Sequence, residues 1–420
     1  MKRIVVIGGG FAGVNFAKKL SNIADFDIVL VDKINYNFFP PLLYQVATGF
    51  LETSSISYPF RKMFSKSNNI HFWLGELVAI NADENKITLS NGELKYDYLV
   101  LATGTTTNYF GMEGVKKHAI PMKTLEDALN MRNILLQRME AASITTDKEE
   151  QEQLLRIVVA GGGPTGVEIS GMFAEMSNTI IKNEYPELSN FINGKIYLVD
   201  GGDALLSTMS VQSQQDTLKA IKEIGVVVNL NTHVSDFDGN TISFNNGGTI
   251  KSKNLIWAAG VTGMRFNGLP NEFYGRGNRL IVNEFNKIKG TENIYAIGDI
   301  SYMDSDVNFP NGHPQVAQVA MQQGKNLAKN LIYKKIGKPE SPFSYKDKGS
   351  MAIIGRNKAV VDIPKPKIHF KGSLAWFTWL FVHLMSLSMP RNKVNTLYHW
   401  AMAYFTRNSA LRMIIRPQKN

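Results

Sequence analysis

The chain has 420 residues and contains no cysteine. This absence excludes disulfide bonds, thiol nucleophiles, thiolate metal sites and redox-active thiol pairs. The seven histidines are scattered, and none pairs with a nearby carboxylate in the spacing of a zinc site, so we expect no metal ion. The chain therefore has no thiol chemistry, and we do not expect a structural or catalytic metal.

Acidic residues are missing from the C-terminal end of the chain. The last one is Asp362, and residues 363–420 contain nine of the 46 Lys and Arg residues. The rest of the chain is close to neutral, with 37 basic and 36 acidic residues, so this tail carries nearly all of the net charge of +10. Anionic lipid and nucleic acid both attract such a tail.

Apolar runs long enough to span a bilayer are also missing. The segment "AWFTWLFVHLMSLSMP" (375–390) has no charged residue, but a spanning helix needs about 20 apolar residues. The apolar run at residues 4–7 is far shorter than the core of a signal peptide, and no small-residue cleavage site follows it. We interpret it as a buried strand and expect an unexported protein.

Two stretches of the chain repeat one another. The segments "KRIVVIGGGFAG" (2–13) and "LRIVVAGGGPTG" (155–166) each place G-x-G-x-x-G after a β-branched run. Each is followed by a strand that ends in an acid, Asp32 or Asp200. Each then has a further strand that enters a small-residue turn, "YDYLVLATGT" or "KNLIWAAGV". Three shared features in one order predict two tandem Rossmann-like dinucleotide-binding units.

The glycines have distinct physical roles in each unit. The first allows the tight turn, the second lets the backbone approach a pyrophosphate, and the third lets the helix pack close to the strand. These residues are Gly8, Gly10 and Gly13 in the first unit and Gly161, Gly163 and Gly166 in the second. The acids are placed to accept hydrogen bonds from ribose hydroxyls. A Gly-rich turn without a ligand is the alternative, and the repetition argues against it.

Two dinucleotide sites without a metal indicate electron transfer from a nicotinamide to a flavin. This layout resembles the two-dinucleotide-binding-domain flavoproteins, whose plan is that of glutathione reductase. The resemblance implies an α/β fold with a discontinuous FAD-binding domain (1–120 and 265–345) and an NADH-binding domain (121–264). A C-terminal membrane-anchoring domain (346–420) follows. Within "NIYAIGDIS" (293–301), Asp299 would contact the ribityl or pyrophosphate part of the flavin, unless it only caps a helix.

NADH is the expected reductant. Asp200 would repel the 2′-phosphate of NADPH, and "GGDALL" after it offers no Arg or Lys.

Between the units, the polar stretch 141–156 is predicted to form one solvent-exposed helix.

The tail is predicted to form two amphipathic helices at a membrane surface, separated by Pro390. The first carries Phe377, Leu380, Phe381, Leu384 and Leu387 near helical spacing, and the second carries Val394, Leu397, Tyr398, Ala401 and Phe405. The tail aromatic residues Trp376, Trp379, Trp400, Tyr398 and Tyr404 suit a headgroup zone. A core-facing subdomain or a dimer contact is the alternative. Nucleic acid is disfavoured, because tails that bind it lack long apolar faces.

The whole chain resembles the type II NADH:quinone oxidoreductases, single-subunit respiratory dehydrogenases that do not pump protons. The most discriminating matches are "NYNFFPPLLYQVATG" (35–49), "PQVAQVAMQQG" (314–324), "GSMAIIGRNKAVVD" (349–362) and the tail "WLFVHLMSLSMPRNK" (379–393). Without cysteine, electrons would pass from the flavin directly to an acceptor, here a quinone.

The resemblance also implies individual residues. Gln318 and Gln322 would line a quinone pocket beside the flavin, unless they only cap backbone groups. Glu168 would orient the nicotinamide or relay protons, unless it is merely an acid favoured by the helix dipole. The expected contacts to non-covalent FAD and to NADH are completed by Phe11, Ala12, Lys33, Leu77, Thr103, Gly104, Ala317, Pro164, Thr165, Ala259 and Gly260.

The implied location is the cytoplasmic face of a bacterial inner membrane, as a peripheral protein that uses ubiquinone or menaquinone. An oily tail is also typical of a homodimer. Two rival functions remain at this point. One is a soluble NAD(P)H-dependent flavoprotein reductase of a ferredoxin or rubredoxin, and the other is a flavin-binding redox sensor at the membrane surface without enzymatic activity.

Overall fold

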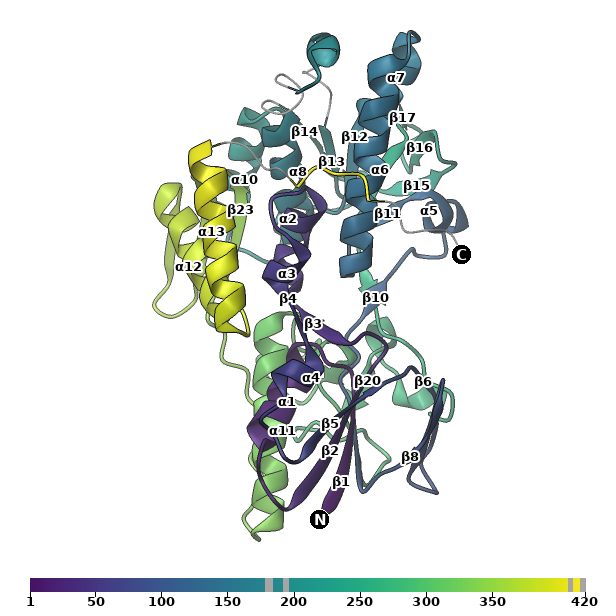
Figure 1. Cartoon of the computed structure of the whole chain (residues 1–420), viewed down its shortest axis with the longest axis vertical. Coiled ribbons are helices and arrows are strands. Elements are labelled where there is room, and N and C mark those ends of the chain that lie inside the picture. The colour runs from purple at the N-terminus through teal and green to yellow at the C-terminus, as the bar shows by residue number, and fades with distance from the viewer. Residues whose placement is uncertain (178–183, 192–195, 407–410, 416–420) are drawn as a thin grey trace. The chain divides into compact units, whose positions relative to one another are not determined.

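The structure, a computed structural model, describes residues 1–177, 184–191, 196–406 and 411–415 (Figure 1). The chain forms two compact units. Unit 1 comprises Met1–Phe38, Ser57–Thr106 and Val261–Asp347, and unit 2 comprises Phe39–Ile56, Thr107–Gly260 and Lys348–Asn420. The three-domain division expected from the sequence stays a proposal.

A parallel five-stranded sheet forms the centre of unit 1, in the order β21-β9-β1-β2-β5. These strands are β1 (Lys2–Ile7), β2 (Phe26–Asp32), β5 (Ile70–Leu74), β9 (Tyr98–Leu101) and β21 (Ile294–Ala296). Residues 4–6 of β1 are fully buried, as expected for a parallel strand covered on both faces. Helices α1 (Phe11–Leu20) and α11 (Ala317–Lys335) pack against each other and share one apolar core with β1 and β2.

Unit 2 contains a second sheet of the same plan, in the order β11-β18-β12-β13-β14. Its strands are β11 (Ile120–Pro121), β12 (Ile157–Ala160), β13 (Ile196–Val199), β14 (Val226–Asn229) and β18 (Asn254–Trp257), all paired in parallel. Helix α8 (Pro164–Met176) follows the second glycine motif, and α10 (Val211–Glu223) precedes β14. The expected pair of Rossmann-like units is therefore confirmed.

The repeat extends to a feature that the sequence motifs did not indicate. Each unit inserts a three-stranded antiparallel sheet before the strand that returns beside the first one. In unit 1 this sheet is β6 (Leu77–Asn81), β7 (Lys86–Leu89) and β8 (Gly92–Lys95). In unit 2 it is β15 (Val234–Phe237), β16 (Thr241–Phe244) and β17 (Thr249–Lys251).

Shorter elements connect these sheets. In unit 1 they include β3 (Tyr36–Phe38), β4 (Ser57–Pro59), α4 (Phe60–Met63), β20 (Leu280–Val282), β22 (Ser301–Met303) and the short helices η4 (Asn271–Phe273), η5 (Arg276–Asn278) and η6 (Gly298–Ile300). In unit 2 they include η1 (Pro40–Leu42), α2 (Leu43–Ala47), α3 (Thr53–Ile56), α5 (Glu113–His118) and η3 (Pro186–Phe191). Strands β10 (Thr106–Thr107) and β19 (Val261–Thr262) pair with each other.

The single helix predicted for residues 141–156 is wrong. Helix α6 (Leu125–Ile144) ends, and α7 (Lys148–Leu155) begins after an N-cap at Asp147. The Asp147 carboxylate accepts hydrogen bonds from the backbone N–H groups of Glu149 and Glu150, which favours a new helix start. The stretch is also less exposed than expected, because Leu154 is buried.

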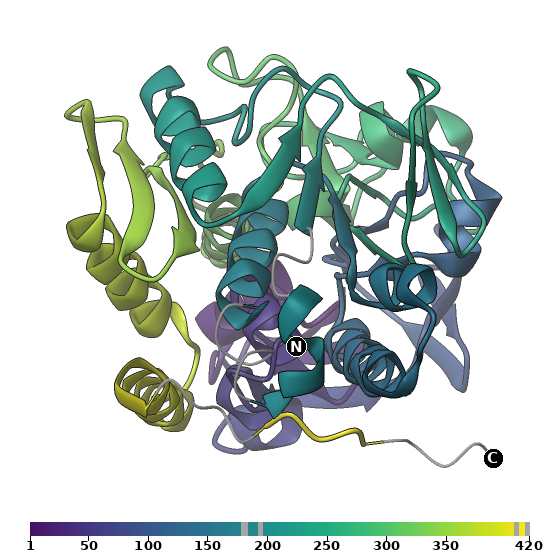
Figure 2. The same ribbon diagram turned by 90° about the horizontal axis from the view of Figure 1, so that it is seen from above.

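The C-terminal part of unit 2 begins with an antiparallel sheet and ends with two helices (Figures 1 and 2). The sheet is β23 (Ser350–Gly355), β24 (Lys358–Ile363) and β25 (Ile368–Lys371). Strand β23 lies against α8 at Gly171, where a Cβ atom would stand 1.8 Å from the Ile354 carbonyl oxygen. Helices α12 (Ser373–Ser386) and α13 (Pro390–Thr406) then follow as neighbours.

Neither helix is long and apolar enough to cross a bilayer, and the same holds for every other helix in the described part of the chain. The two-helix prediction is confirmed, with Pro390 opening the second helix. The apolar face predicted for α13 is exposed at Val394, Leu397, Tyr398, Ala401 and Phe405.

On α12 the prediction holds only in part. Phe377 and Phe381 are exposed, Leu380 and Leu384 are half-buried, and Leu387 is buried. The tail residues Arg407, Arg416 and Lys419 lie outside the described residues.

Gly171 offers a test of the contact between α8 and the C-terminal sheet. We expect Gly171→Ala to lower the free energy of unfolding by about 1–3 kcal/mol, because the added Cβ would force β23 away from α8. Chemical denaturation followed by circular dichroism measures this change.

The matched control is Ser170→Ala on the preceding residue. The Ser170 hydroxyl is fully buried and has no hydrogen-bond partner among the described residues, so its removal should leave stability unchanged or slightly higher. Equal stability of Gly171→Ala and the wild type would contradict the close packing.

Candidate functional site

In unit 1 the first glycine motif forms a turn at the carboxyl end of β1. Gly8 has φ +106°, and a Cβ there would lie 2.4 Å from the Ala102 carbonyl oxygen. A Cβ at Gly13 would lie 1.9 Å from the Gly8 carbonyl oxygen, so α1 approaches the loop as closely as the backbone allows. Gly10 is different, because no atom lies within 4 Å of its added Cβ. The protein's own packing does not require glycine at that position.

The neighbouring strands β2 and β9 contribute polar groups beside this turn. Here "edge" means the side of the sheet formed by the carboxyl ends of its parallel strands. Asp32 Oδ2 accepts from the Gly9 N–H at 2.6 Å, and Oδ1 accepts from the Ile34 N–H at 3.0 Å. Burial nevertheless raises the pKa of Asp32. After β9, the Thr103 hydroxyl is buried without a hydrogen-bond partner among the described residues, and Gly104 again leaves open space around its added Cβ.

A third segment reaches this edge at the end of β21. Gly298 begins η6, and its N–H donates to Gln323 Oε1 of α11 at 2.7 Å. Its added Cβ would lie 3.0 Å from the Ala12 Cβ, so η6, α1 and α11 converge there. Asp299 is the second residue of η6, and its carbonyl accepts from Gln315 Nε2 at 3.1 Å.

The remaining predicted residues of unit 1 lie around this edge. Phe11 and Ala12 open α1, Ala317 and Gln318 open α11, and Lys33 and Leu77 follow the ends of β2 and β5. Gln322 is already engaged, because its amide donates to the Lys346 carbonyl at 2.9 Å and accepts from the Lys346 N–H at 3.0 Å. The Gln322 side chain therefore fixes the segment after α11 to the helix.

Unit 2 repeats the arrangement. Gly161 has φ +116° with its added Cβ 2.4 Å from the Ala258 carbonyl oxygen, and the Cβ of Gly166 would lie 1.7 Å from the Gly161 carbonyl oxygen. Gly163 has open space, like Gly10, and Pro164 and Thr165 start α8 behind it. Asp200 accepts from the N–H groups of Gly162 at 2.5 Å and Gly202 at 2.7 Å.

A pocket opens at the carboxyl ends of the parallel strands of this unit, with about 900 Å³ of empty space that includes part of the open solvent. It brings together the predicted residues Gly161, Asp200 and Ala259. Gly260 follows directly, and its carbonyl accepts from the Asn108 N–H at 3.0 Å.

The same pocket has lining residues that sequence reasoning missed, among them Phe110, Trp257, Thr232 and His233. Thr232 and His233 follow β14 in the sequence, and Trp257 ends β18. The rule that ligands bind at the carboxyl ends of parallel strands could have found these three residues. Phe110 follows no strand of the sheet and gave no such signal.

Glu168 lies elsewhere in unit 2. It is the fifth residue of α8 and is 7% exposed, so it is not an acid of the first helical turn. Its Oε1 accepts from the Trp379 indole N–H at 3.1 Å and from the Ile353 N–H at 3.4 Å. Burial raises the pKa of Glu168 to about 8 in spite of these donors. The carboxyl group can therefore gain or lose a proton near neutral pH.

Aromatic side chains surround the indole that donates to this carboxyl group. Trp379 is fully buried rather than placed in a headgroup zone, so that prediction is wrong for it. Its ring stacks on His383 with centroids 3.8 Å apart and meets Tyr44 edge-on at 6.5 Å. Burial lowers the pKa of His383 to about 4, so this imidazole is neutral.

A second hydrogen-bonded chain lies alongside. The Trp400 indole donates to Gln45 Oε1 at 2.7 Å, and Gln45 Nε2 donates to the Tyr44 hydroxyl at 3.0 Å. Helices α12 and α13 are thus tied to α2 and α8 by indole N–H groups.

No group of three His, Cys, Asp or Glu side chains that could hold a metal ion occurs in the described segments.

Comparisons with known proteins agree with this architecture. The model of the pyridine nucleotide-disulphide oxidoreductase family matches residues 2–324, and that of the NDH2 C-terminal domain matches residues 348–413. The structure of NDH2 from Plasmodium falciparum in complex with NADH superposes with a TM-score of 0.89 at 23% identity, over 99% of this chain and 100% of that one.

Curated relatives are more similar in sequence. The type II NADH:quinone oxidoreductase NdhA of Mycobacterium tuberculosis is 33% identical over 96% of this chain and 87% of its own length. The enzyme Ndh of the same organism is also 33% identical, over 96% and 88%. The chain belongs to the pyridine nucleotide-disulphide oxidoreductases and, within them, to the type II NADH:quinone oxidoreductases.

The raised pKa of Glu168 makes stability depend on pH. Between the ordinary pKa of 4.5 and about 8, the folded protein keeps a proton that the unfolded chain has lost. Stability from this group is therefore lost as pH rises through that window, by up to about 1.4 kcal/mol per pH unit. We expect Glu168→Gln to remove this slope in urea unfolding measured at pH 5 to 9.

Two further variants sharpen the test. Trp379→Phe removes one donor to the carboxylate and should shift the upper limit of the window to higher pH. Glu126→Gln, at an exposed position on α6, should leave the slope unchanged. If Glu168→Gln and the wild type differed by the same amount at every pH, Glu168 would not be the buried titrating group.

Proposed function

We propose that this protein is an FAD-dependent NADH:quinone oxidoreductase of a respiratory chain that does not pump protons. When bound, the flavin would accept a hydride from NADH and pass two electrons to quinone. The observation that carries the proposal is the pair of glycine-motif turns at the carboxyl ends of two parallel sheets. They occur in a chain without cysteine. No thiol pair can receive the electrons, so they must pass to an external acceptor.

The edge in unit 1 suits non-covalent FAD. Open space at Gly10 and Gly104 leaves room for a pyrophosphate close to the backbone, and the start of α1 offers N–H groups to it. Asp32 would accept from ribose hydroxyls, and the Thr103 hydroxyl has a hydrogen bond to give. Asp299 would face the ribityl or pyrophosphate part of the flavin.

The pocket in unit 2 suits NADH. Gly163 leaves space for its pyrophosphate, and Asp200 would hold the adenosine ribose. The carboxylate of Asp200 would repel a 2′-phosphate, which disfavours NADPH. The ring of Trp257 or Phe110 offers an apolar surface to the adenine.

Gln318 and Gln322 would line the quinone pocket, as the resemblance implies. An amide can hydrogen-bond a quinone carbonyl without adding charge. The Gln322 amide also contacts the backbone of Lys346, so it would hold the segment after α11 beside the quinone.

Glu168 would serve proton transfer. With its pKa near 8, the carboxyl group can deliver a proton toward reduced quinone and regain one from solvent at neutral pH. The Trp379 N–H holds it in one orientation.

The tail would place the protein at a membrane surface. Exposed apolar side chains recur along both helices, at Leu374, Phe377, Phe381 and Met385 on α12 and at Val394, Leu397, Tyr398, Met402 and Phe405 on α13. Basic residues of the tail suit the anionic lipids of a cytoplasmic leaflet, which supports a peripheral location on the inner face of a bacterial membrane. A homodimer would use exposed apolar surface of the same kind.

Rapid mixing separates the two half-reactions. NADH should bleach the flavin absorbance of the purified protein, and a short-chain quinone should restore it. Gly163→Ala should slow bleaching at least tenfold, because its Cβ occupies the space meant for the pyrophosphate. Gln318→Ala should leave bleaching intact and slow reoxidation by quinone about tenfold.

Gln212→Ala, at an exposed position on α10, is the matched control, and it should leave reoxidation unchanged. A protein that stays yellow with NADH would support the redox-sensor alternative. Faster reoxidation by a ferredoxin or rubredoxin than by quinone would support the soluble-reductase alternative. Either result would overturn the proposal.

Membrane binding can be tested on the exposed apolar face. We expect the combined variant Phe377→Ser, Phe381→Ser, Leu397→Ser and Phe405→Ser to bind anionic lipid vesicles more than tenfold more weakly in co-sedimentation. Each of these side chains is at least 54% exposed, and burying one contributes about 1.5–3 kcal/mol.

Ile144→Ser provides the control, because Ile144 is 84% exposed but lies at the end of α6. It should sediment with vesicles like the wild type. Unchanged binding of the four-residue variant would show that this face does not contact lipid.

A further inference from the structure

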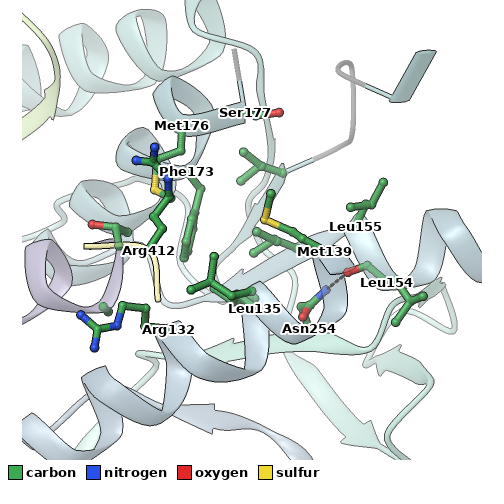
Figure 3. Close-up of a pocket in the computed structure, with 15 residues that line it drawn as sticks. Arg132, Leu135, Met139, Leu154, Leu155, Phe173, Met176, Ser177, Asn254 and Arg412 are labelled. Carbon is green, nitrogen blue, oxygen red and sulfur yellow. Dashed lines mark hydrogen bonds between the residues drawn. The ribbon is translucent and has the colours of Figure 1, made fainter. Parts of the chain in front are cut away.

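A cavity of about 780 Å³, part of it open to solvent, lies in unit 2 among α2, α6, α8 and the adjacent sheet (Figure 3). Most of its lining is apolar, with Leu135 and Met139 from α6, Phe173 and Met176 from α8, and Leu155 from α7. A lining of this kind suits an alkyl chain.

This cavity is separate from the nucleotide pocket of the same unit. It is lined by Ile157, Ile196 and Asn254, which are the first residues of β12, β13 and β18. Gly161 and Asp200 follow the last residues of β12 and β13. Because the strands are parallel, the two pockets lie at opposite edges of the sheet and share no lining residue.

One charged side chain in the lining lacks a counter-ion. Arg132 of α6 is 8% exposed, its Nε has no hydrogen-bond partner, and it forms no ion pair with any residue that the structure describes. The other polar lining groups are engaged: Arg412 pairs with Glu184, and Asn254 donates to the Leu154 carbonyl at 2.7 Å. A buried guanidinium without a partner is costly, so a bound anion would stabilise it.

The lining is also polarised. In Figure 3, Arg132 and Arg412 lie at one end of the cavity, and Leu154 and Leu155 lie at the other. A ligand that matches this arrangement has an anionic head and an apolar chain. A neutral quinone would leave the guanidinium unpaired, and a doubly charged phosphate would bring more charge than the single unpaired cation balances.

We propose that this cavity binds one long-chain aliphatic carboxylate, with the carboxylate paired to Arg132 and the alkyl chain among the Leu, Met and Phe side chains. Arginine suits this role because its planar guanidinium can form two parallel hydrogen bonds to a carboxylate. The proposal does not depend on the redox activity of the protein.

Binding to the intact, flavin-loaded protein tests this idea with dodecanoate and dodecan-1-ol below their micelle concentrations. In thermal unfolding and calorimetry, dodecanoate should raise Tm and bind at least tenfold more tightly than the alcohol, because only the carboxylate pairs with the guanidinium. Equal binding of acid and alcohol, or no shift in Tm with dodecanoate, would contradict the proposal.

Variants locate the site. Arg132→Met should abolish the preference for the acid while keeping the ligand-free Tm at or above that of the wild type, since Arg132 gives up no partner. Arg391→Met, at an exposed position on α13, should keep the preference. This control reports adsorption to the exposed apolar helices rather than to the cavity.

A cavity-filling variant covers the case in which Arg132→Met does not fold. Leu135→Trp places a larger side chain inside the cavity and should weaken binding of both acid and alcohol at least tenfold. Retention of dodecanoate binding by Leu135→Trp, or of the acid preference by Arg132→Met, would place the binding elsewhere and overturn the proposal.

Discussion

In both units, the geometry of the glycine-motif turn depends on the close approach of a helix to the strand before it. In each unit the third glycine of the motif stands so near the carbonyl of the first that a Cβ would lie less than 2 Å from it. This contact fixes the helix start over the strand end, where its N–H groups can face a pyrophosphate. The middle glycine contacts nothing and leaves space. The packing of the fold therefore requires two of the three glycines and does not require the middle one.

Much of this could be predicted from sequence because the signals are local. The glycine spacing, the apolar strands and the acids at Asp32 and Asp200 lie within short segments, and the structure has the predicted strands with each acid at a strand end. The break between α6 and α7 was missed because two helix-prone runs meet without Gly or Pro. The cap at Asp147 followed by two acids was a usable local signal.

What sequence reasoning could not supply are contacts between distant segments. Hydropathy assigned Trp379 to a membrane interface, yet its indole donates to Glu168, 211 residues earlier, and is fully buried. Nothing in the sequence indicated that the amide of Gln322 donates to the carbonyl of Lys346, 24 residues later. Composition reports how apolar a segment is, whereas only the fold decides which neighbour satisfies each polar atom.

The C-terminal helices therefore combine two roles on two faces. The inner face carries indole N–H groups that bind Glu168 and Gln45, and it removes water from a carboxyl group whose pKa is raised to about 8. The outer face carries Phe and Leu side chains that nothing in the described chain covers. A surface helix that met only lipid would not need a buried tryptophan bonded to an acid. Through Trp379, any shift of α12 relative to α8 would alter the donor set of Glu168 and with it the proton affinity of that group.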